Sequence, residues 1–170
     1  MSRASFSTRS LTTDGFNRLA AGKPPEAGLE LPAGGLSPPE VLAMLAGISG
    51  SLRESIEPNA WMVLDHNRII ALCSITRLVE PGVVNIGYGT APGEEGRGAA
   101  KAAVAGVLAW SREDDRIRVV VAETGLANTA SQRVLQANGF QVVGERSDAE
   151  DGDLLCWRWD KPAERSSGGA

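Results

Sequence analysis

The segment from Ile86 to Lys101, IGYGTAPGEEGRGAAK, joins a strand-like start, a glycine-rich loop and an alanine-rich helix. Glycine allows a loop to bring its main-chain N–H groups close to a ligand. The first turn of the following helix adds N–H groups without helical partners and the positive end of the helix dipole. This order of elements predicts a socket for an anionic group such as a diphosphate, and therefore a phosphate-bearing cofactor.

A second segment whose residues could do chemistry runs from Asn128 to Phe140, NTASQRVLQANGF. Its pattern predicts a helix over residues 128–138 that ends at Gly139. Asn128 and Ser131 lie one turn apart on one face of that helix, where they either cap free N–H groups or contact a ligand. Glu123 ends the β-branched strand before this helix and is either a general base or a solvated carboxylate.

The elements that position these residues begin after Pro58, where the apolar pattern becomes strand-like. The pattern predicts a hairpin and then a third strand, followed by a helix, a strand, a helix and two strands joined by the acidic turn Asp148–Asp153. The expected strands are residues 60–64, 69–75, 83–89, 117–123, 140–143 and 154–159. This order predicts an α/β fold, a mixed layer with a central and mostly antiparallel sheet flanked by helices.

The N-terminal part has weaker signals. Residues 1–12 alternate weakly and predict an edge strand, and Thr13–Asp14 is expected to cap a short helix. The Pro- and Gly-rich residues 20–39 predict a loop that wraps the surface or covers a site. Ser37 is expected to cap a second helix, whose apolar set is Val41, Leu42, Leu45, Ile48 and Leu52.

Composition narrows the class of protein. A chain of 170 residues predicts one domain, here residues 1–160, with a disordered tail over 161–170. The net charge of −4 and the lack of a Lys/Arg run argue against nucleic acid as a partner. The polar N-terminus lacks the apolar run of a signal peptide, and no segment approaches a membrane span. Cys73 and Cys156 are expected to be reduced thiols of a cytoplasmic protein, and the ligands of a zinc site are missing.

Two of these segments together resemble a known family. Residues 89–100 resemble the cofactor loop of the Gcn5-related N-acetyltransferases (GNATs), and residues 128–140 resemble their later Asn-to-Gly-Phe segment. The branch that looks most similar is that of the ribosomal-protein-alanine acetyltransferases. The similarity extends over residues 61–159. Residues 1–60, the part that usually shapes the acceptor site in this family, match weakly.

The resemblance assigns cofactor contacts residue by residue. The family loop Gln/Arg-x-x-Gly-x-Gly/Ala falls on Glu95–Ala100, which implies that main-chain groups of residues 96–101 bind the diphosphate of acetyl-coenzyme A. Those residues are Gly96, Arg97, Gly98, Ala99, Ala100 and Lys101. The pantetheine arm is expected along Tyr88, Gly89 and Thr90, with a further contact from Asn128. Glu95 departs from the family pattern; we expect it to point outward, its charge offset in part by Arg97 and Lys101.

The resemblance also implies direct transfer of an acetyl group to a primary amine, either a protein N-terminus or a small amine. The Tyr that serves as general acid in many relatives is replaced here by Leu135, so Ser131 is the candidate donor to the leaving thiolate. Glu123 is the candidate base, because Asn85 stands where relatives often have Glu. If Glu123 is not the base, a chain of water molecules must take the proton from the amine, which favours an α-amine acceptor. The alternative is a non-catalytic coenzyme A sensor on the same fold. A homodimer is common among relatives.

Overall fold

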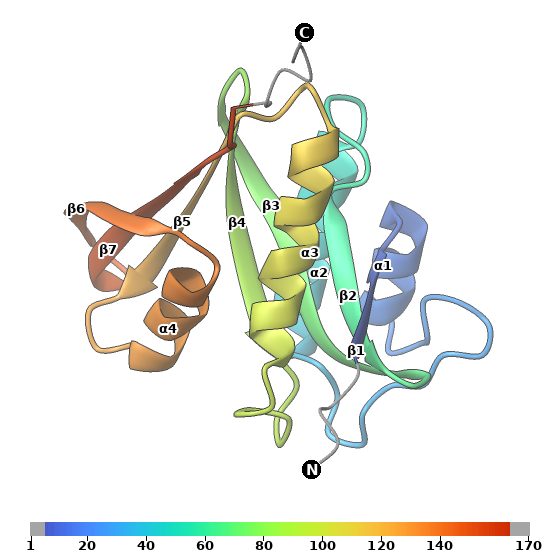
Figure 1. Cartoon of the computed structure of the whole chain (residues 1–170). Coiled ribbons are helices and arrows are strands. Elements are labelled where there is room, and N and C mark those ends of the chain that lie inside the picture. The colour runs from blue at the N-terminus through green and yellow to red at the C-terminus, as the bar shows by residue number, and fades with distance from the viewer. Residues whose placement is uncertain (1–5, 164–170) are drawn as a thin grey trace, which may run out of the picture.

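The structure is a computed structural model that describes residues 6–163. It forms one seven-stranded sheet with the strand order β1-β2-β3-β4-β5-β7-β6 (Figure 1). The elements are β1 (Phe6–Ser10), α1 (Thr13–Ala20), α2 (Pro39–Leu52), β2 (Ala60–Asp65), β3 (Arg68–Glu80), β4 (Val83–Thr90), α3 (Ala99–Glu113), β5 (Val119–Gly125), α4 (Thr129–Ala137), β6 (Gln141–Asp148) and β7 (Gly152–Asp160). The predicted α/β fold with its mostly antiparallel sheet is confirmed. No helix within residues 6–163 is long and apolar enough to span a membrane.

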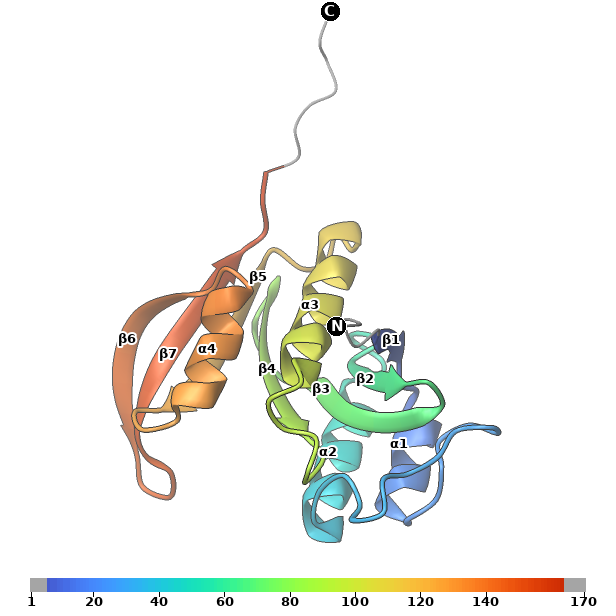
Figure 2. The same ribbon diagram turned by 60° about the horizontal axis from the view of Figure 1, so that its bottom comes forward.

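The sheet buries a different set of side chains on each face. Alternating residues of β2 to β4 send Trp61, Val63 and Ile86 into one core cluster, which includes the apolar side of α3. The residues between them send Met62 and Leu72 into a second cluster with α1 and α2. Figure 2 shows α3 on one side of β2–β4 and α2 on the other. The central strands are therefore covered on both faces.

The sheet divides between β4 and β5. These two strands are the parallel pair, and they pair only over Val83–Asn85 and Val119–Val121. Beyond that point β5 stays paired with β7 as far as Gly125, so it leaves β4 together with the β5–β7–β6 unit. Figure 1 shows the two strands diverging, with α4 on the far side of the gap from α3. The second half of β4, Ile86–Thr90, is left with one edge that pairs with no strand of the described chain.

Some local predictions were wrong at element ends. Thr12, not Thr13–Asp14, caps α1, because its hydroxyl accepts the N–H of Gly15 at 3.0 Å. Pro38 precedes α2 and no side chain caps that helix, so Ser37 is not a cap. Strands β3 and β6 run further than predicted, because each pairs with the next strand in the chain almost up to the turn that joins them, beyond its apolar residues. The expected tail over 161–170 lies mostly outside the described residues.

Candidate functional site

The glycine-rich loop enters α3 with the geometry of an anion site. Gly98 precedes the helix with φ of +85°, a conformation that glycine adopts without strain, and no side chain caps the helix. The first hydrogen bond of the helix runs from the N–H of Ala102 to the carbonyl of Gly98 at 3.0 Å. Within the described residues, the N–H groups of Ala99, Ala100 and Lys101 have no main-chain partner. This end of α3 therefore presents several free donors.

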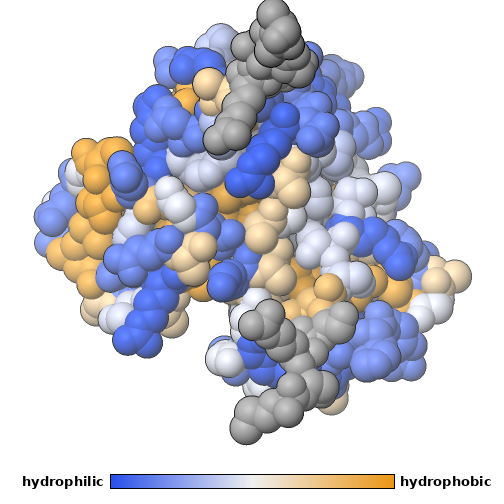
Figure 3. Space-filling view, in the orientation of Figure 1, coloured by the Kyte–Doolittle hydropathy of each residue, from blue (hydrophilic) through white to orange (hydrophobic). Residues whose placement is uncertain are grey.

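These donors face a pocket of about 570 Å³ between the loop, β4 and α4. Figure 3 shows the notch in the surface at this place, between α4 and the N-terminal end of α3. We call it the loop pocket; its lining is Tyr88, Gly89, Thr90, Glu94, Glu95, Gly96, Gly98, Ala99, Ala100, Lys101, Asn128, Ala130, Ser131, Arg133 and Val134. The structure thus brings together the cofactor-site residues expected from the sequence, except Arg97. It also adds Arg133 and Val134, which helical spacing from Ala130 places on the same side of α4.

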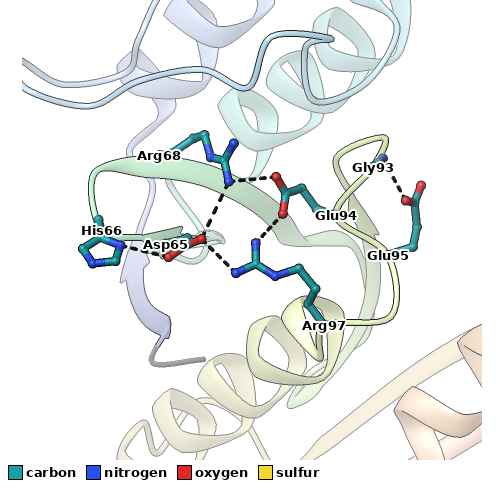
Figure 4. A network of polar contacts seen from close by, with 7 residues as sticks. All are labelled: Asp65, His66, Arg68, Gly93, Glu94, Glu95 and Arg97. Atoms are coloured by element: carbon teal, nitrogen blue, oxygen red, sulfur yellow. Dashed lines mark hydrogen bonds and ion pairs between the residues drawn. The ribbon is translucent and has the colours of Figure 1, made fainter. Parts of the chain in front are cut away.

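The side chain of Arg97 turns away from this pocket. Its guanidinium donates to the carboxylates of Glu94 and Asp65, the latter at 2.9 Å, and Arg68 reaches Glu94 at 3.0 Å (Figure 4). The hydrogen bond from Arg97 is the main reason that the pKa of Asp65 lies below its usual range. The expectation that Arg97 offsets the charge of Glu95 is therefore wrong, because two carboxylates already neutralise it. Its effect is to tie the glycine-rich loop to the β2–β3 turn.

Glu95 is exposed, and its side chain folds back onto its own loop. Its carboxylate accepts the N–H of Gly93 at 2.8 Å (Figure 4). The residue is part of the lining of the loop pocket. Its charge therefore stays on the surface of the loop, near the pocket. Lys101 and Arg133 are the two basic residues that line the pocket in the described chain. Its acidic residues are Glu94, whose carboxylate is already paired with Arg68 and Arg97, and Glu95.

Replacing Glu95 by Gln should raise the affinity for coenzyme A about two- to tenfold at low ionic strength. The amide can keep the bond to Gly93, while one negative charge near the diphosphate is removed. Isothermal titration at rising salt should show the gain shrinking, because salt screens exposed charges. Glu150→Gln, in the exposed β6–β7 turn, removes the same charge far from the pocket and should leave the affinity unchanged. A weaker Glu95→Gln complex would show that the carboxylate supports the loop rather than opposing the ligand.

Ser131 of α4 and Tyr88 of β4 contact each other across the gap between β4 and β5. Asn128 caps α4 by accepting the N–H of Ser131 at 3.1 Å, which leaves its amide N–H groups available to a ligand. The hydroxyl of Tyr88 donates to the main-chain carbonyl of Ser131 at 3.1 Å. Burial raises the pKa of Tyr88 to about 12. Three hydroxyl residues therefore line the loop pocket: Ser131 from α4, and Tyr88 and Thr90 from β4.

The candidate base Glu123 lies outside the loop pocket. The β4–β5 register pairs Asn85 with Val121, so Glu123 faces the same side of the sheet as Asn85, towards α2. One of its oxygens, Oε2, is bonded by Arg146 at 2.6 and 2.8 Å. Asn85 donates to the hydroxyl of Thr76 at 2.7 Å, and its Oδ1 has no partner within residues 6–163. Leu135 is fully buried in the core, so it offers nothing to the site.

A second pocket, of about 210 Å³, opens on the opposite face of the sheet. We call it the α2 pocket; its lining is Leu36, Ser37, Val41, Leu45, Leu72, Ser74, Gly87, Tyr88 and Gly89. Tyr88 and Gly89 line both pockets. The unpaired half of β4 is thus reached from the loop pocket on one side and from the α2 pocket on the other.

A protein-family model matches the part of the chain that contains both pockets. The model of the acetyltransferase (GNAT) domain matches residues 27–141. The chain belongs to the GNAT acetyltransferase family. The match begins well before residue 61, so it includes α2 and part of the N-terminal region that resembled the family weakly from its sequence. Among curated proteins, none matches significantly.

Solved structures of other GNAT proteins share the fold. A ribosomal-protein-S5-alanine acetyltransferase from Vibrio fischeri is 17% identical with a TM-score of 0.67, covering 95% of this chain and 94% of that one. The ribosomal L7/L12 α-N-protein acetyltransferase RimL, solved with coenzyme A, is also 17% identical, with a TM-score of 0.66 and coverage of 92% and 94%. A spermidine N-acetyltransferase chimera from Vibrio cholerae and a human enzyme is 14% identical, with a TM-score of 0.65 and coverage of 94% and 96%. At these identities the likeness concerns the fold alone.

The loop pocket of this GNAT domain fits a coenzyme A diphosphate. A Cβ built on Gly96 or Gly98 would meet no atom within 4 Å, so the loop leaves open space where the free N–H groups point. Main-chain donors and the basic side chains of Lys101 and Arg133 suit an anionic ligand. No group of three or more His, Cys, Asp and Glu side chains within residues 6–163 is arranged to hold a metal ion.

Proposed function

We propose that this GNAT protein transfers an acetyl group from acetyl-coenzyme A directly to a primary amine. The observation that carries the proposal is the meeting of the two pockets at Tyr88 and Gly89, on the unpaired edge of β4. A ligand anchored at the N-terminus of α3 and extended along this edge would present its thioester to a nucleophile in the α2 pocket. Two sides of one strand would then serve two substrates, without a covalent enzyme intermediate.

The residues of the loop pocket would hold the cosubstrate. The N–H groups between Gly96 and Lys101 would bind the diphosphate, and Asn128 would contact the arm. The arm would follow Tyr88, Gly89 and Thr90. Because the N–H of Ala91 donates to Ile70 of β3, alternation along the strand leaves the N–H groups of Tyr88 and Thr90 on the unpaired edge, where they could stabilise negative charge on the thioester oxygen. Acetyl-coenzyme A supplies the activated acetyl group; the protein supplies position and hydrogen-bond donors.

Proton transfer would use groups on both faces of the sheet. Of the hydroxyl residues that line the loop pocket, Ser131 and Tyr88 meet across the gap between α4 and β4, and one of them would donate to the departing thiolate. Glu123 would accept a proton from the amine through its second carboxylate oxygen, directly or by way of water, while Arg146 holds the first. Cys73 and Cys156 are both free thiols, which fits a reducing compartment, so we place the enzyme in the cytoplasm.

The residues at the expected proton-transfer positions favour a non-catalytic coenzyme A sensor instead. The carboxylate of Glu123 is engaged by Arg146, and Leu135 and Asn85 lack the proton-handling groups expected at their positions. Such a protein would bind the cosubstrate and turn nothing over. Binding and turnover must therefore be measured separately.

Acetyl-coenzyme A at about a hundred times its Kd should stabilise the fold by about 2.7 kcal/mol, or a rise in Tm of roughly 5–10 °C. Differential scanning calorimetry tests this. A panel of amines assayed for release of free thiol, with the acetylated product confirmed by mass spectrometry, tests turnover. No rise in Tm would refute both readings, whereas a rise without any acetylated amine would leave only the sensor.

A further inference from the structure

The α2 pocket differs from the loop pocket in its chemistry. Aliphatic side chains dominate it: Leu36 from the loop before α2, Val41 and Leu45 from α2, and Leu72 from β3. Its polar side chains are the hydroxyls of Ser37 and Ser74; Tyr88 also lines it, but the side chain of Tyr88 lies on the other face of the sheet, where its hydroxyl meets Ser131. No acidic, basic or histidine residue of the described chain lines it. The occupant must therefore be largely apolar and must bring no charge that needs a partner.

The elements around the pocket explain its shape. Val41 and Leu45 are one helical turn apart and half-buried, so they form one wall rather than part of the core. Leu72 and Ser74 alternate on β3 and face the same side of the sheet. Across from them Gly87 and Gly89 carry no side chain; Gly87 pairs with Ser74, and a Cβ at Gly89 would meet nothing within 4 Å. The missing side chains leave the main chain of β4 accessible from the α2 pocket.

We propose that the α2 pocket binds an acceptor whose α-amine is next to an aliphatic side chain, such as the N-terminal residue of a peptide or an amino-acid amide. This inference rests on the proposed acetyl transfer. An aliphatic side chain of valine or leucine size gains about 1.5–3 kcal/mol when it is buried. The pocket, at about 210 Å³, is less than half the size of the loop pocket, at about 570 Å³. The acceptor's side chain lies in it with room to spare, and its amine lies at Tyr88 and Gly89.

Charge separates this acceptor from a polyamine. A polyamine carries further ammonium groups, and each ammonium held in an apolar pocket without a carboxylate loses hydration and gains no partner. Charged side chains at the first position of a peptide meet the same cost. The hydroxyls of Ser37 and Ser74 offer hydrogen bonds to an amine or amide but do not neutralise a cation.

The pKa of the acceptor leads to the same choice. The attacking nitrogen must be neutral, and no carboxylate or imidazole lines this pocket to deprotonate it. An α-amine with a pKa of about 7.7–8.0 is roughly a third neutral at pH 7.5, whereas a lysine-like amine with a pKa of about 10.4 is neutral in about one molecule per thousand. An α-amine can therefore react with help from Glu123 or from water alone.

The experiment compares matched acceptors with the full chain and saturating acetyl-coenzyme A. The acceptors are tetrapeptides that differ only in their first residue (Val, Leu, Asp or Lys), valine amide, leucine amide and spermidine. We expect kcat/KM for Val or Leu to exceed that for Asp or Lys at least tenfold, and that for spermidine at least a hundredfold. Equal rates for peptides and amides would assign recognition to the first residue alone. A preference for spermidine, or no discrimination at the first residue, would overturn the proposal.

A pair of variants on α2 tests the pocket itself. Leu45→Glu places a carboxylate in its wall and should lower kcat/KM for aliphatic acceptors at least tenfold while raising it for Lys-first peptides. Met44→Glu makes the same change at the neighbouring residue, which is 57% exposed and lies outside the pocket lining, so it should change neither value. Both variants should keep the wild-type Kd for acetyl-coenzyme A, which shows that they are folded.

The outcomes also distinguish a failure of the acceptor assignment from a failure of the proposed acetyl transfer. If no amine in the panel is acetylated although acetyl-coenzyme A binds, the proposed function fails. If amines are acetylated but Leu45→Glu and Met44→Glu behave alike, the acetyl transfer stands and the assignment of the α2 pocket is wrong.

Discussion

Replacing Gly98 by Val is expected to lower the affinity for acetyl-coenzyme A at least a hundredfold. Gly98 has a φ of +85° at the start of α3, and a β-branched residue there would force the loop out of its conformation. The new side chain would also enter the open space in front of the free N–H groups. Losing two hydrogen bonds to a charged diphosphate, at about 1.5–3 kcal/mol each, weakens binding by roughly two to four orders of magnitude. Isothermal titration measures the change.

The matched control for this variant is Gly152→Val. Gly152 has a φ of +75° at the start of β7, directly after the β6–β7 turn, and its Cβ would also meet nothing within 4 Å. Both variants therefore strain the backbone in the same way and should lose similar free energy of unfolding. Only Gly98→Val should lose the ligand. If Gly98→Val bound acetyl-coenzyme A within about threefold of the wild type, the loop would not be the diphosphate site.

The part of the site that the sequence predicted well is local. A strand, glycines and a helix in immediate succession define where Gly96 to Lys101 must lie, because a helix N-terminus has free N–H groups wherever it occurs. The second segment followed from helix chemistry: Asn128 caps α4 through the N–H of Ser131, as its residue type and position indicate. Both segments could therefore be predicted from their own residues, without reference to the rest of the chain.

The parts that the sequence could not predict depend on distant partners. Arg97 seemed to be a phosphate-site cation, but Asp65, far along the chain, engages its guanidinium. Val41 and Leu45 fit the apolar face of a helix. They line a pocket because Gly87 and Gly89, on the sheet opposite them, have no side chains. Helical spacing separates apolar from polar faces, but it does not say whether an apolar side chain packs against protein or faces an open cavity.

Replacing Tyr88 by Phe is expected to lower kcat about a hundred- to a thousandfold with little change in the Kd of acetyl-coenzyme A. Tyr88 is the chain's one tyrosine, and its hydroxyl lies in the loop pocket 3.1 Å from the carbonyl of Ser131. A phenol is a stronger acid than the hydroxyl of Ser131, and losing a positioned acid costs about 10²–10⁴ in rate. Ser131→Ala should lower kcat about ten- to a hundredfold, as expected for a lost hydrogen bond to the thiolate.

A control must separate this role from a loss of packing. Thr124→Val removes another buried hydroxyl, the acceptor of the indole N–H of Trp157 at 2.9 Å, on a strand outside both pockets. It should cost about 1 kcal/mol of stability and leave kcat unchanged. If Ser131→Ala lost more activity than Tyr88→Phe, the donor would be Ser131, as the family resemblance implies.

The same tyrosine allows a direct titration. Because the chain has one tyrosine, the near-ultraviolet absorbance of tyrosinate reports on Tyr88 alone, and burial should move its midpoint from about 10 to about 12. The folded state favours the neutral phenol, so its stabilising effect is complete below pH 10 and is lost as the pH rises towards 12. A phenol that stays protonated in this range is ready to donate at neutral pH. A midpoint near 10 would mean that the hydroxyl is open to water rather than buried between β4 and α4.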